Sequence, residues 1–176
     1  DAAAQPAVFD CDLCHTGADG GPLRTFASVT FPSGAVIENL GSESICMQCH
    51  QGRASTANVD GSIASAGVGD DTPSSRLRFS NIHYFAAAAT MYGTLVKGGY
   101  QYAGKTYDGK FAHVDGYAEC SDCHNPHSLE IRTERCDTCH GNVKGQADLK
   151  NIRYIGSMTD YDGDGNMSEG IYYEIE

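Results

Sequence analysis

Four copies of one five-residue pattern could carry the chemistry of this sequence. In each copy two cysteines stand three positions apart and a histidine directly follows the second, and together the copies use all eight cysteines. The thiols belong to Cys11, Cys14, Cys46, Cys49, Cys120, Cys123, Cys136 and Cys139, and the histidines are His15, His50, His124 and His140. This spacing is the signature of c-type haem attachment, in which the thiols bond to the porphyrin and the histidine becomes the proximal iron ligand. The sequence therefore predicts four covalent haems.

Other uses of paired cysteines fit this pattern less well. A redox dithiol or a tetrathiolate zinc site does not need a histidine directly after every second cysteine. A disulfide framework does not need a repeated spacing of this kind. A secreted scaffold held together by disulfides stays the structural alternative to haem binding.

Three further histidines are candidates for the distal faces of the irons. The chain has seven histidines, and the four motifs leave His83, His113 and His127. His127 follows His124 by three residues, across Pro126, so it cannot reach round to the far face of the same haem. We expect it to ligate a neighbouring iron, which would hold two haems close together for fast electron hopping.

Three spare histidines cannot serve four irons, so one distal position needs another ligand or stays open. Exchange between identical subunits does not change the count, because every subunit that receives a histidine also gives one. The candidates are Met91, Met158, Met167, the amine of Asp1 and water. A methionine would raise the potential of that haem. Met91 would lie about 80° round a shared helix from His83, where packing is its expected role and ligation the alternative.

An acidic stretch near the end of the sequence matches the start of a calcium loop. Oxygen ligands would come from Asp160, Asp162, Asp164 and Asn166, with a glycine at position 6 of the loop. Position 12 is Ile171 instead of glutamate, so the bidentate ligand is missing or comes from Glu169, Glu174 or elsewhere. The alternatives are a structural Ca²⁺ site and a plain acidic turn.

The composition is poor for a conventional hydrophobic core. Hydrophobic residues make up 40% of the 176 residues, tryptophan is absent and 21 residues are glycine. We expect a mostly irregular multihaem cytochrome c fold, stitched together by haems that form its core, with few short helices and a small β-hairpin. Residues 1–140 would be the tetrahaem-binding domain, and residues 141–176 a haem-free tail packed on it. Without haem such a chain should be unfolded.

Local patterns predict few regular elements. They indicate a strand over 35–40, a helix at the second motif capped by Ser42 or Ser44, and a buried helix over 82–92 that ends at Gly93. They also indicate a hairpin over 98–107 that turns at 103–104. Residues 52–75 are mostly small and polar and predict a loop.

Charge and hydropathy limit the partners. The formal net charge of −11 argues against nucleic acid and anionic lipid, and no apolar run is long enough to span a bilayer. Because c-type haem is attached outside the cytoplasm, we expect an exported protein whose signal peptide has been removed, with Asp1 as the mature N-terminus. An extracellular or cell-surface location is what the family resemblance below implies.

The stretches 81–90, 97–107 and 120–127, together with His113, resemble the tetrahaem extracellular cytochromes of the OmcE type, which polymerise into cytochrome nanowires. The resemblance covers about residues 80–140. It implies a head-to-tail homopolymer with a continuous chain of haems in alternating parallel and T-shaped stacks. It also implies that His83, His113 and His127 are distal ligands, one of them across the subunit interface. The sequence departs from this pattern in lacking the eighth histidine that ligation of every iron by two histidines would need.

Three functions follow from this pattern. The first is electron conduction along a filament, without substrate chemistry, toward redox proteins or extracellular acceptors. The second is a soluble periplasmic tetrahaem shuttle. The third is a reductase that acts on a small oxyanion or a hydroxylamine-like substrate at an open haem, although the twelve Lys and Arg residues do not cluster visibly.

Overall fold

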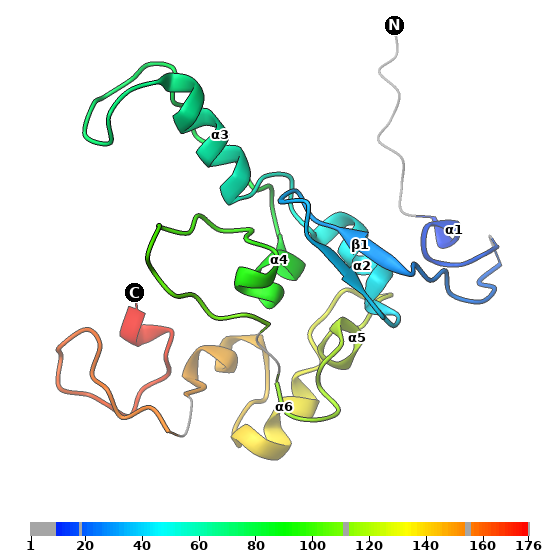
Figure 1. Cartoon of the computed structure of the whole chain (residues 1–176). Helices are drawn as coiled ribbons and strands as arrows, with labels where there is room; N and C mark the ends of the chain where they lie inside the picture. Colours follow the sequence, from blue (N-terminus) through cyan, green and yellow to red (C-terminus); the bar gives the residue numbers. More distant parts are fainter. Residues whose placement is uncertain (1–9, 18, 111–112, 154–155, 176) are drawn as a thin grey trace, which may run out of the picture. The chain divides into compact units, whose positions relative to one another are not determined.

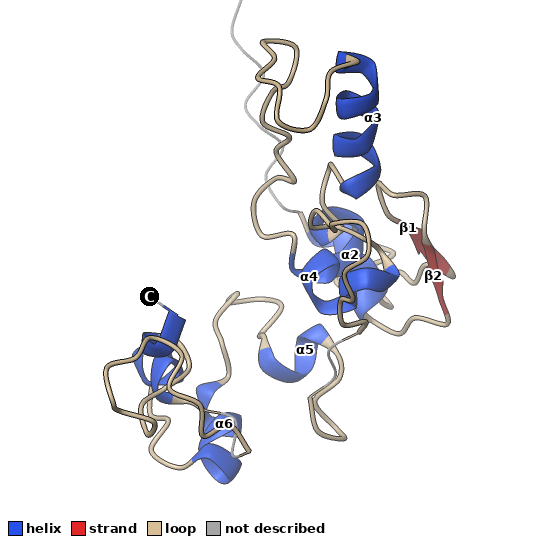
Figure 2. Ribbon diagram, turned by 60° about the vertical axis from the view of Figure 1, so that its left-hand side comes forward, coloured by secondary structure: helices blue, strands red, loops and turns tan. Residues whose placement is uncertain are grey.

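The computed structural model describes residues 10–17, 19–110, 113–153 and 156–175, and most of these residues lie in loops and turns (Figures 1 and 2). The helices are α1 (Cys11–Cys14), α2 (Glu43–His50), α3 (Thr56–Ala66), α4 (Ala87–Tyr92), α5 (Cys120–Cys123) and α6 (Thr133–His140). Short 3-10 helices follow at η1 (Gly93–Leu95), η2 (Gln146–Asn151) and η3 (Tyr173–Ile175), and the strands are β1 (Ser28–Thr30) and β2 (Val36–Glu38). The expected mostly irregular fold with few short helices agrees with this.

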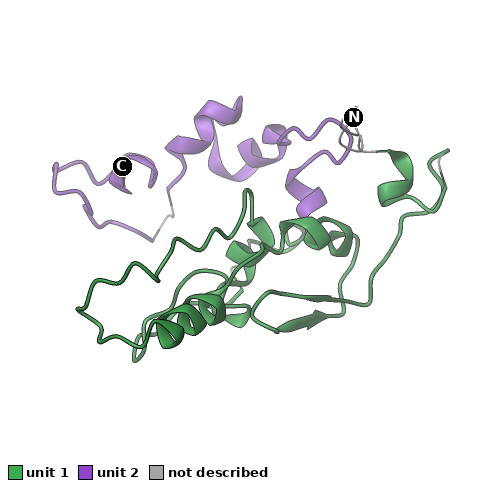
Figure 3. Cartoon of the chain, turned by 90° about the horizontal axis from the view of Figure 1, so that it is seen from above, with its two compact units in different colours: residues 1–119 green, residues 120–176 purple. Residues whose placement is uncertain are grey.

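Backbone contacts divide the chain into two compact units, residues 1–119 and 120–176 (Figure 3). The predicted boundary lay at residue 140, after the fourth cysteine motif, whereas this division lies before the third. The third and fourth motifs therefore share a unit with the C-terminal tail. The extent of haem binding, over 1–140, stays a prediction.

One small antiparallel sheet lies in the first unit. Val29 of β1 stands opposite Ile37 of β2, so a strand forms within the predicted range 35–40. The hairpin predicted over 98–107 is wrong, because residues 98–107 contain a turn at 103–104 but no strand. In that segment Gln101 N–H donates to Oγ1 of Thr56 (3.1 Å), so part of its backbone bonds to α3 in place of a partner strand.

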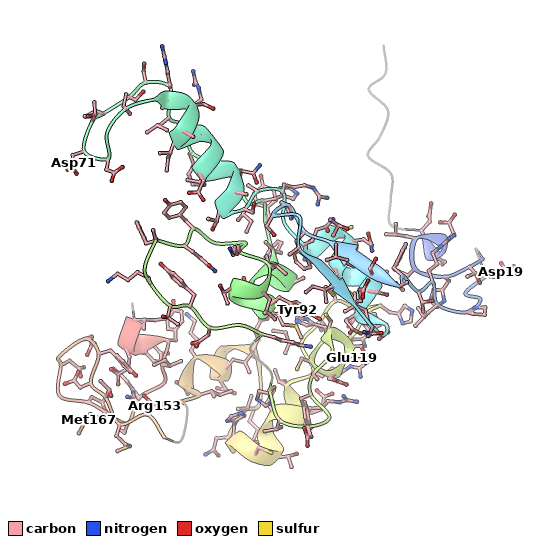
Figure 4. The ribbon with its side chains drawn as sticks, viewed as in Figure 1. Asp19, Asp71, Tyr92, Glu119, Arg153 and Met167 are labelled. Atoms are coloured by element: carbon pink, nitrogen blue, oxygen red, sulfur yellow. The ribbon has the colours of Figure 1, made fainter. Side chains whose placement is uncertain are left out.

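The first unit has one hydrophobic cluster, formed by β1, α2, α4 and the residues that follow them. Its buried members are Val29, Phe31, Met47, Ala88, Ala89, Tyr92 and Val96. Met47 is 1% exposed, and the ring of Phe31 packs against that of Tyr92, with the centroids 6.0 Å apart. Figure 4 labels Tyr92 on α4. This cluster fixes α2, and with it the second cysteine motif, against α4.

The prediction of a loop over 52–75 is wrong in part, because helix α3 lies within that range. The N-terminus of α3 has a capping box, in which Oδ1 of Asn58 accepts from the backbone N–H of Ser55 (2.8 Å). Gly67 closes the helix with a left-handed φ of 64°. Helix α2 begins after Ser42, as predicted, but the Ser42 hydroxyl donates to the Glu119 carboxylate (2.9 Å) and makes no cap hydrogen bond.

Helix α4 begins later than predicted. The pattern indicated a helix from Ile82, whereas α4 starts at Ala87 and ends, as expected, at Gly93. The backbone leaves the helical region before α4, because φ is 81° at His83 and 49° at Phe85. His83 and Met91 therefore do not share a helix, and the angle expected between them does not apply.

The second unit has almost no apolar interior. Among its described residues, Val143 is the sole buried hydrophobic side chain, at 3% exposed. The last segment is instead organised by Arg153, which forms an ion pair with the buried Glu174 and donates to the carbonyls of Ser157 (2.9 Å) and Thr159 (2.5 Å) (Figure 4). A polar network takes the place of a core here.

Candidate haem-attachment sites

All four cysteine motifs fold as a turn of α-helix. The motifs are α1, the second half of α2, α5 and the second half of α6. Residues three apart on a helix lie on the same side of it, so each turn presents its two thiols together. None of the eight cysteines, all of which lie among the described residues, forms a disulfide in the structure.

The first and third motifs share one local structure. Each has a four-residue helix whose histidine follows directly and forms an isolated antiparallel bridge, His15 with Leu23 and His124 with Ile131. In both motifs the residue after the bridge partner is an arginine, and its backbone N–H donates to the carbonyl of the motif's second cysteine. Arg24 donates to Cys14 and Arg132 donates to Cys123, each at 2.8 Å. A loop of similar length thus closes behind each of these motifs.

The second and fourth motifs share a different structure. Both α2 and α6 have eight residues, with cysteines at the fourth and seventh positions and the histidine at the eighth. His50 and His140 therefore close their helices. Each compact unit holds one motif of each kind, in the same order.

Hydrogen bonds fix the orientation of two of the predicted proximal histidines. Nδ1 of His15 lies 2.5 Å from the carbonyl oxygen of Gly21, and Nδ1 of His50 lies 2.5 Å from that of Phe85. A carbonyl oxygen only accepts, so Nδ1 carries the proton in both rings. Nε2 is left as the lone-pair nitrogen, which is the arrangement that a metal-ligating histidine needs.

The third and fourth motifs lie close to each other within the second unit. Nη1 of Arg135, on α6, donates to the carbonyl oxygen of Asp122 on α5 (2.9 Å). The pKa of the Cys123 thiol is raised, first by burial and then by the nearby Cys136 thiol. Groups attached to these two motifs would therefore be neighbours.

The predicted distal histidines lie on exposed loops. His83 and His127 are both exposed, and each follows an asparagine by two residues. The His113 side chain is exposed too, with its ring 5.8 Å from the ring of Tyr117. The structure brings the loop of His83 to the second motif, because Arg53 N–H donates to the Ile82 carbonyl (2.8 Å) beside α2.

The methionines differ in their surroundings. Met91 is partly buried and packs against the hydrophobic cluster, which agrees with its expected packing role; iron ligation by Met91 stays a prediction. Met158 and Met167 are exposed, and Met167 lies in the acidic loop region (Figure 4). The amine of Asp1 lies outside the described residues.

The acidic loop brings its predicted ligands together. One carboxylate oxygen from each of Asp160, Asp162 and Asp164 lies within 4.8 Å of the others. Asp160 accepts from the N–H groups of Gly163 (2.6 Å) and Gly165 (2.9 Å). Burial raises the pKa of Asp160, but these donors outweigh it and the pKa lies below its usual range.

Two glutamates approach the same loop. One carboxylate oxygen from each of Asp162, Glu169 and Glu174 lies within 4.8 Å of the others. These are the two glutamates that the sequence suggests as sources of the bidentate ligand. Glu174 already bonds to Arg153 and to the N–H of Tyr161 (2.7 Å). Asn166 Oδ1 accepts from Ser168 N–H (3.2 Å). Calcium binding stays a prediction.

Sequence reasoning missed the backbone groups that support the motifs. The carbonyls of Gly21 and Phe85 orient the rings of His15 and His50, and no side-chain pattern in the sequence indicates these contacts. The sequence does contain a signal for the two isolated β-bridges. An apolar residue followed by arginine stands after the first motif, at 23–24, and after the third, at 131–132. The two dipeptides occupy corresponding places in the structure.

The surface of the described residues fits a bulky apolar group. Twenty large hydrophobic side chains are exposed, among them Phe79, Phe85 and Leu129, while nine hydrophobic residues are buried. Together with the paired thiols and the Nε2 atoms of His15 and His50, this exposed apolar surface fits covalent haem.

Over the part of the chain that the structure describes, no helix combines the length and the apolar character needed to cross a membrane. Comparison of the chain with protein-family models, with curated proteins and with solved structures gives no match.

Proposed function

We propose that the chain is a tetrahaem c-type cytochrome subunit that polymerises into an extracellular filament and conducts electrons. The observation that carries the haem part is the common structure of the four motifs, in which a helical turn pairs two thiols beside a histidine. A haem at each motif would supply an iron that alternates between its ferrous and ferric states. No substrate chemistry is required.

The chain's own residues perform three tasks in this proposal. The eight cysteines hold the porphyrins covalently, so that none is lost outside the cell. The carbonyls of Gly21 and Phe85 keep the proton of the His15 and His50 rings on Nδ1, so that Nε2 is the atom that would ligate iron. The contact between Arg135 and Asp122 keeps the third and fourth motifs close, as hopping between neighbours requires.

The distal ligands are assigned to His83, His113 and His127. Nδ1 of His50 faces the Phe85 carbonyl, so residues near Phe85 lie on the side of that ring away from iron. His83 is two residues from Phe85 and would thus serve an iron other than that of His50, just as His127 would serve one other than that of His124. Both loops then link neighbouring haems. The proposal also includes a structural Ca²⁺ in the acidic loop.

The polymer part rests on the resemblance of residues 80–140 to nanowire cytochromes. Electron microscopy of native protein from the cell surface tests it. Filaments one subunit wide with continuous haem density would support it, and at sufficient resolution would identify the fourth distal ligand. Discrete particles of one chain's mass would overturn it and leave the periplasmic shuttle, which shares the haems and lacks the polymer.

A separate measurement tests the reductase alternative. Cyanide or nitric oxide added to the native protein reports an accessible iron by its optical spectrum. If neither changes the spectrum of any haem, the open site that a reductase needs is absent. Binding at one haem would instead favour the reductase.

A further inference from the structure

Two loops that carry predicted distal histidines share a local structure. In the first, Oδ1 of Asn81 accepts from the backbone N–H of His83 at 2.8 Å. In the second, Oδ1 of Asn125 accepts from the N–H of His127 at 3.0 Å. Each is an Asx turn, in which an asparagine side chain replaces a backbone turn and fixes the residue two positions on.

The likeness extends beyond the hydrogen bond. Two residues after each histidine stands a large apolar residue with a left-handed backbone, Phe85 at φ 49° and Leu129 at φ 61°. Both side chains are exposed, Phe85 by 82% and Leu129 by 77%. The two five-residue loops therefore follow one pattern, Asn-x-His-x-apolar, although only the second adjoins its cysteine motif in sequence.

Such backbone conformations are uncommon for these residue types. Among the described residues, the non-glycine positions with positive φ are Asn39, His83, Phe85, Lys97, Leu129 and Asn142. Asparagine tolerates the left-handed region, whereas a large residue with a Cβ enters it at a cost in free energy. With the two asparagines set aside, three of the four remaining positions fall in the two histidine loops. Strain of this kind gathers at functional sites.

We propose that Asn81 and Asn125 are positioning residues for the distal iron ligands His83 and His127. Each amide oxygen fixes the backbone of the histidine, so the imidazole is held ready for its iron before the iron arrives. This inference rests on the proposed haem function. It goes beyond it by assigning roles to two residues that would touch neither iron nor porphyrin.

The test compares Asn81→Ala and Asn125→Ala with Asn81→Asp and Asn125→Asp in the haem-loaded protein. An aspartate oxygen accepts the same N–H, so only the alanine variants lose the turn. We expect each alanine variant to keep four covalent haems but to show one of the four with a weakened distal ligand. The signs are a high-spin component in the electron paramagnetic resonance spectrum and uptake of added imidazole, and the aspartate variants should restore the native spectrum.

Two controls make the outcome specific. Asn39→Ala removes an asparagine that lies outside the two histidine loops, at φ 57°, and should leave every ligand spectrum unchanged. His83→Ala and His127→Ala set the signature of a lost ligand. Native spectra in both alanine variants, or equal damage in the aspartate variants, would overturn the inference, as would native spectra in the histidine variants.

The haem count separates this inference from the proposed function. If the unmodified protein carries no covalent haem, the proposed function itself fails. If it carries four haems and the asparagine variants behave as native, only the positioning role fails. Mass measurement of every variant distinguishes these cases.

Discussion

The side chains of the motifs take their directions from backbone groups. The Gly21 carbonyl at Nδ1 of His15 selects one tautomer of the ring, and the two thiols of each motif are aligned because a helix repeats nearly every fourth residue. A side chain so held does not need to be ordered when it binds, which lowers the entropic cost of ligation. The chemistry of a motif thus depends on its immediate backbone.

Replacing both cysteines of one motif by serine should remove one haem and leave the others. For Cys136→Ser with Cys139→Ser, we expect three covalent haems, because each motif has its own helical turn that carries its two thiols. The mass of the denatured chain measures this directly. Thr138→Ala, at a position between these two cysteines, should keep all four haems. A mass for the serine variant that still includes four haems would contradict covalent attachment at this motif.

Met47 lies between two motif cysteines but belongs to the hydrophobic core. Its side chain is 1% exposed within the cluster, so Met47→Ala should cost about 2–5 kcal/mol of unfolding free energy. Met47→Leu keeps the volume and should cost less than about 1.5 kcal/mol. Denaturant unfolding measures both. A change in a haem spectrum with leucine would instead indicate that Met47 is a ligand.

At the scale of elements, local sequence predicts some features and misses others. The strand within 35–40 and the helix end at Gly93 were predictable, because alternation and glycine act locally. Helix α3 was missed because small residues mask its pattern, although Ser55, Asn58 and Gly67 mark its ends. The start of α4 was not predictable from the apolar residues after Ile82, because the Asn81 side chain competes for the backbone there.

Gly93 ends α4 where the chain passes close to another segment. A Cβ there would lie against the Asp108 carbonyl oxygen and 2.7 Å from that of Gly109, and φ is 51°. Gly93→Ala should therefore destabilise the first unit by more than about 1 kcal/mol, as a lower thermal unfolding midpoint. Gly99→Ala, which meets no atom within 4 Å, is the matched control. Equal midpoints for the two variants would contradict this account of the α4 end.

The C-terminal segment should loosen in acid. The N–H of Tyr161 and then Arg153 hold the pKa of Glu174 below its usual value. Because the pKa is depressed in the folded state, the stabilisation is present above the unfolded value of about 4.3 and is lost as pH falls through the folded pKa. Hydrogen-exchange protection of residues 156–175, taken relative to the intrinsic exchange rate at each pH between pH 7 and pH 3, measures this. Glu174→Gln should flatten the dependence, and an unchanged profile would contradict the assignment.

For the whole molecule, the distribution of apolar side chains is the main energetic fact. The first unit buries one cluster of seven residues, and the described part of the second buries only Val143 among its hydrophobic residues. A chain of this size needs far more burial to offset its conformational entropy. The covalent groups would have to supply that burial.

The chain without haem should therefore not fold. With all eight cysteines replaced by serine, we expect a disordered circular dichroism spectrum and no cooperative thermal transition. The haem-loaded protein at the same concentration is the control. A cooperative transition in the serine variant would show that the polypeptide has a sufficient core of its own.

The closed loops behind the first and third motifs bear on how the protein matures. A backbone hydrogen bond joins Arg24 to Cys14, and another joins Arg132 to Cys123. Each joins residues about ten positions apart, so the contacts of these two motifs are local in sequence. Loops of this length close in roughly 10–100 ns. Each such motif can take its shape before later parts of the chain have folded. If the chain binds haem as proposed, we therefore expect the first and third motifs to be able to take up haem before the rest of the chain has folded.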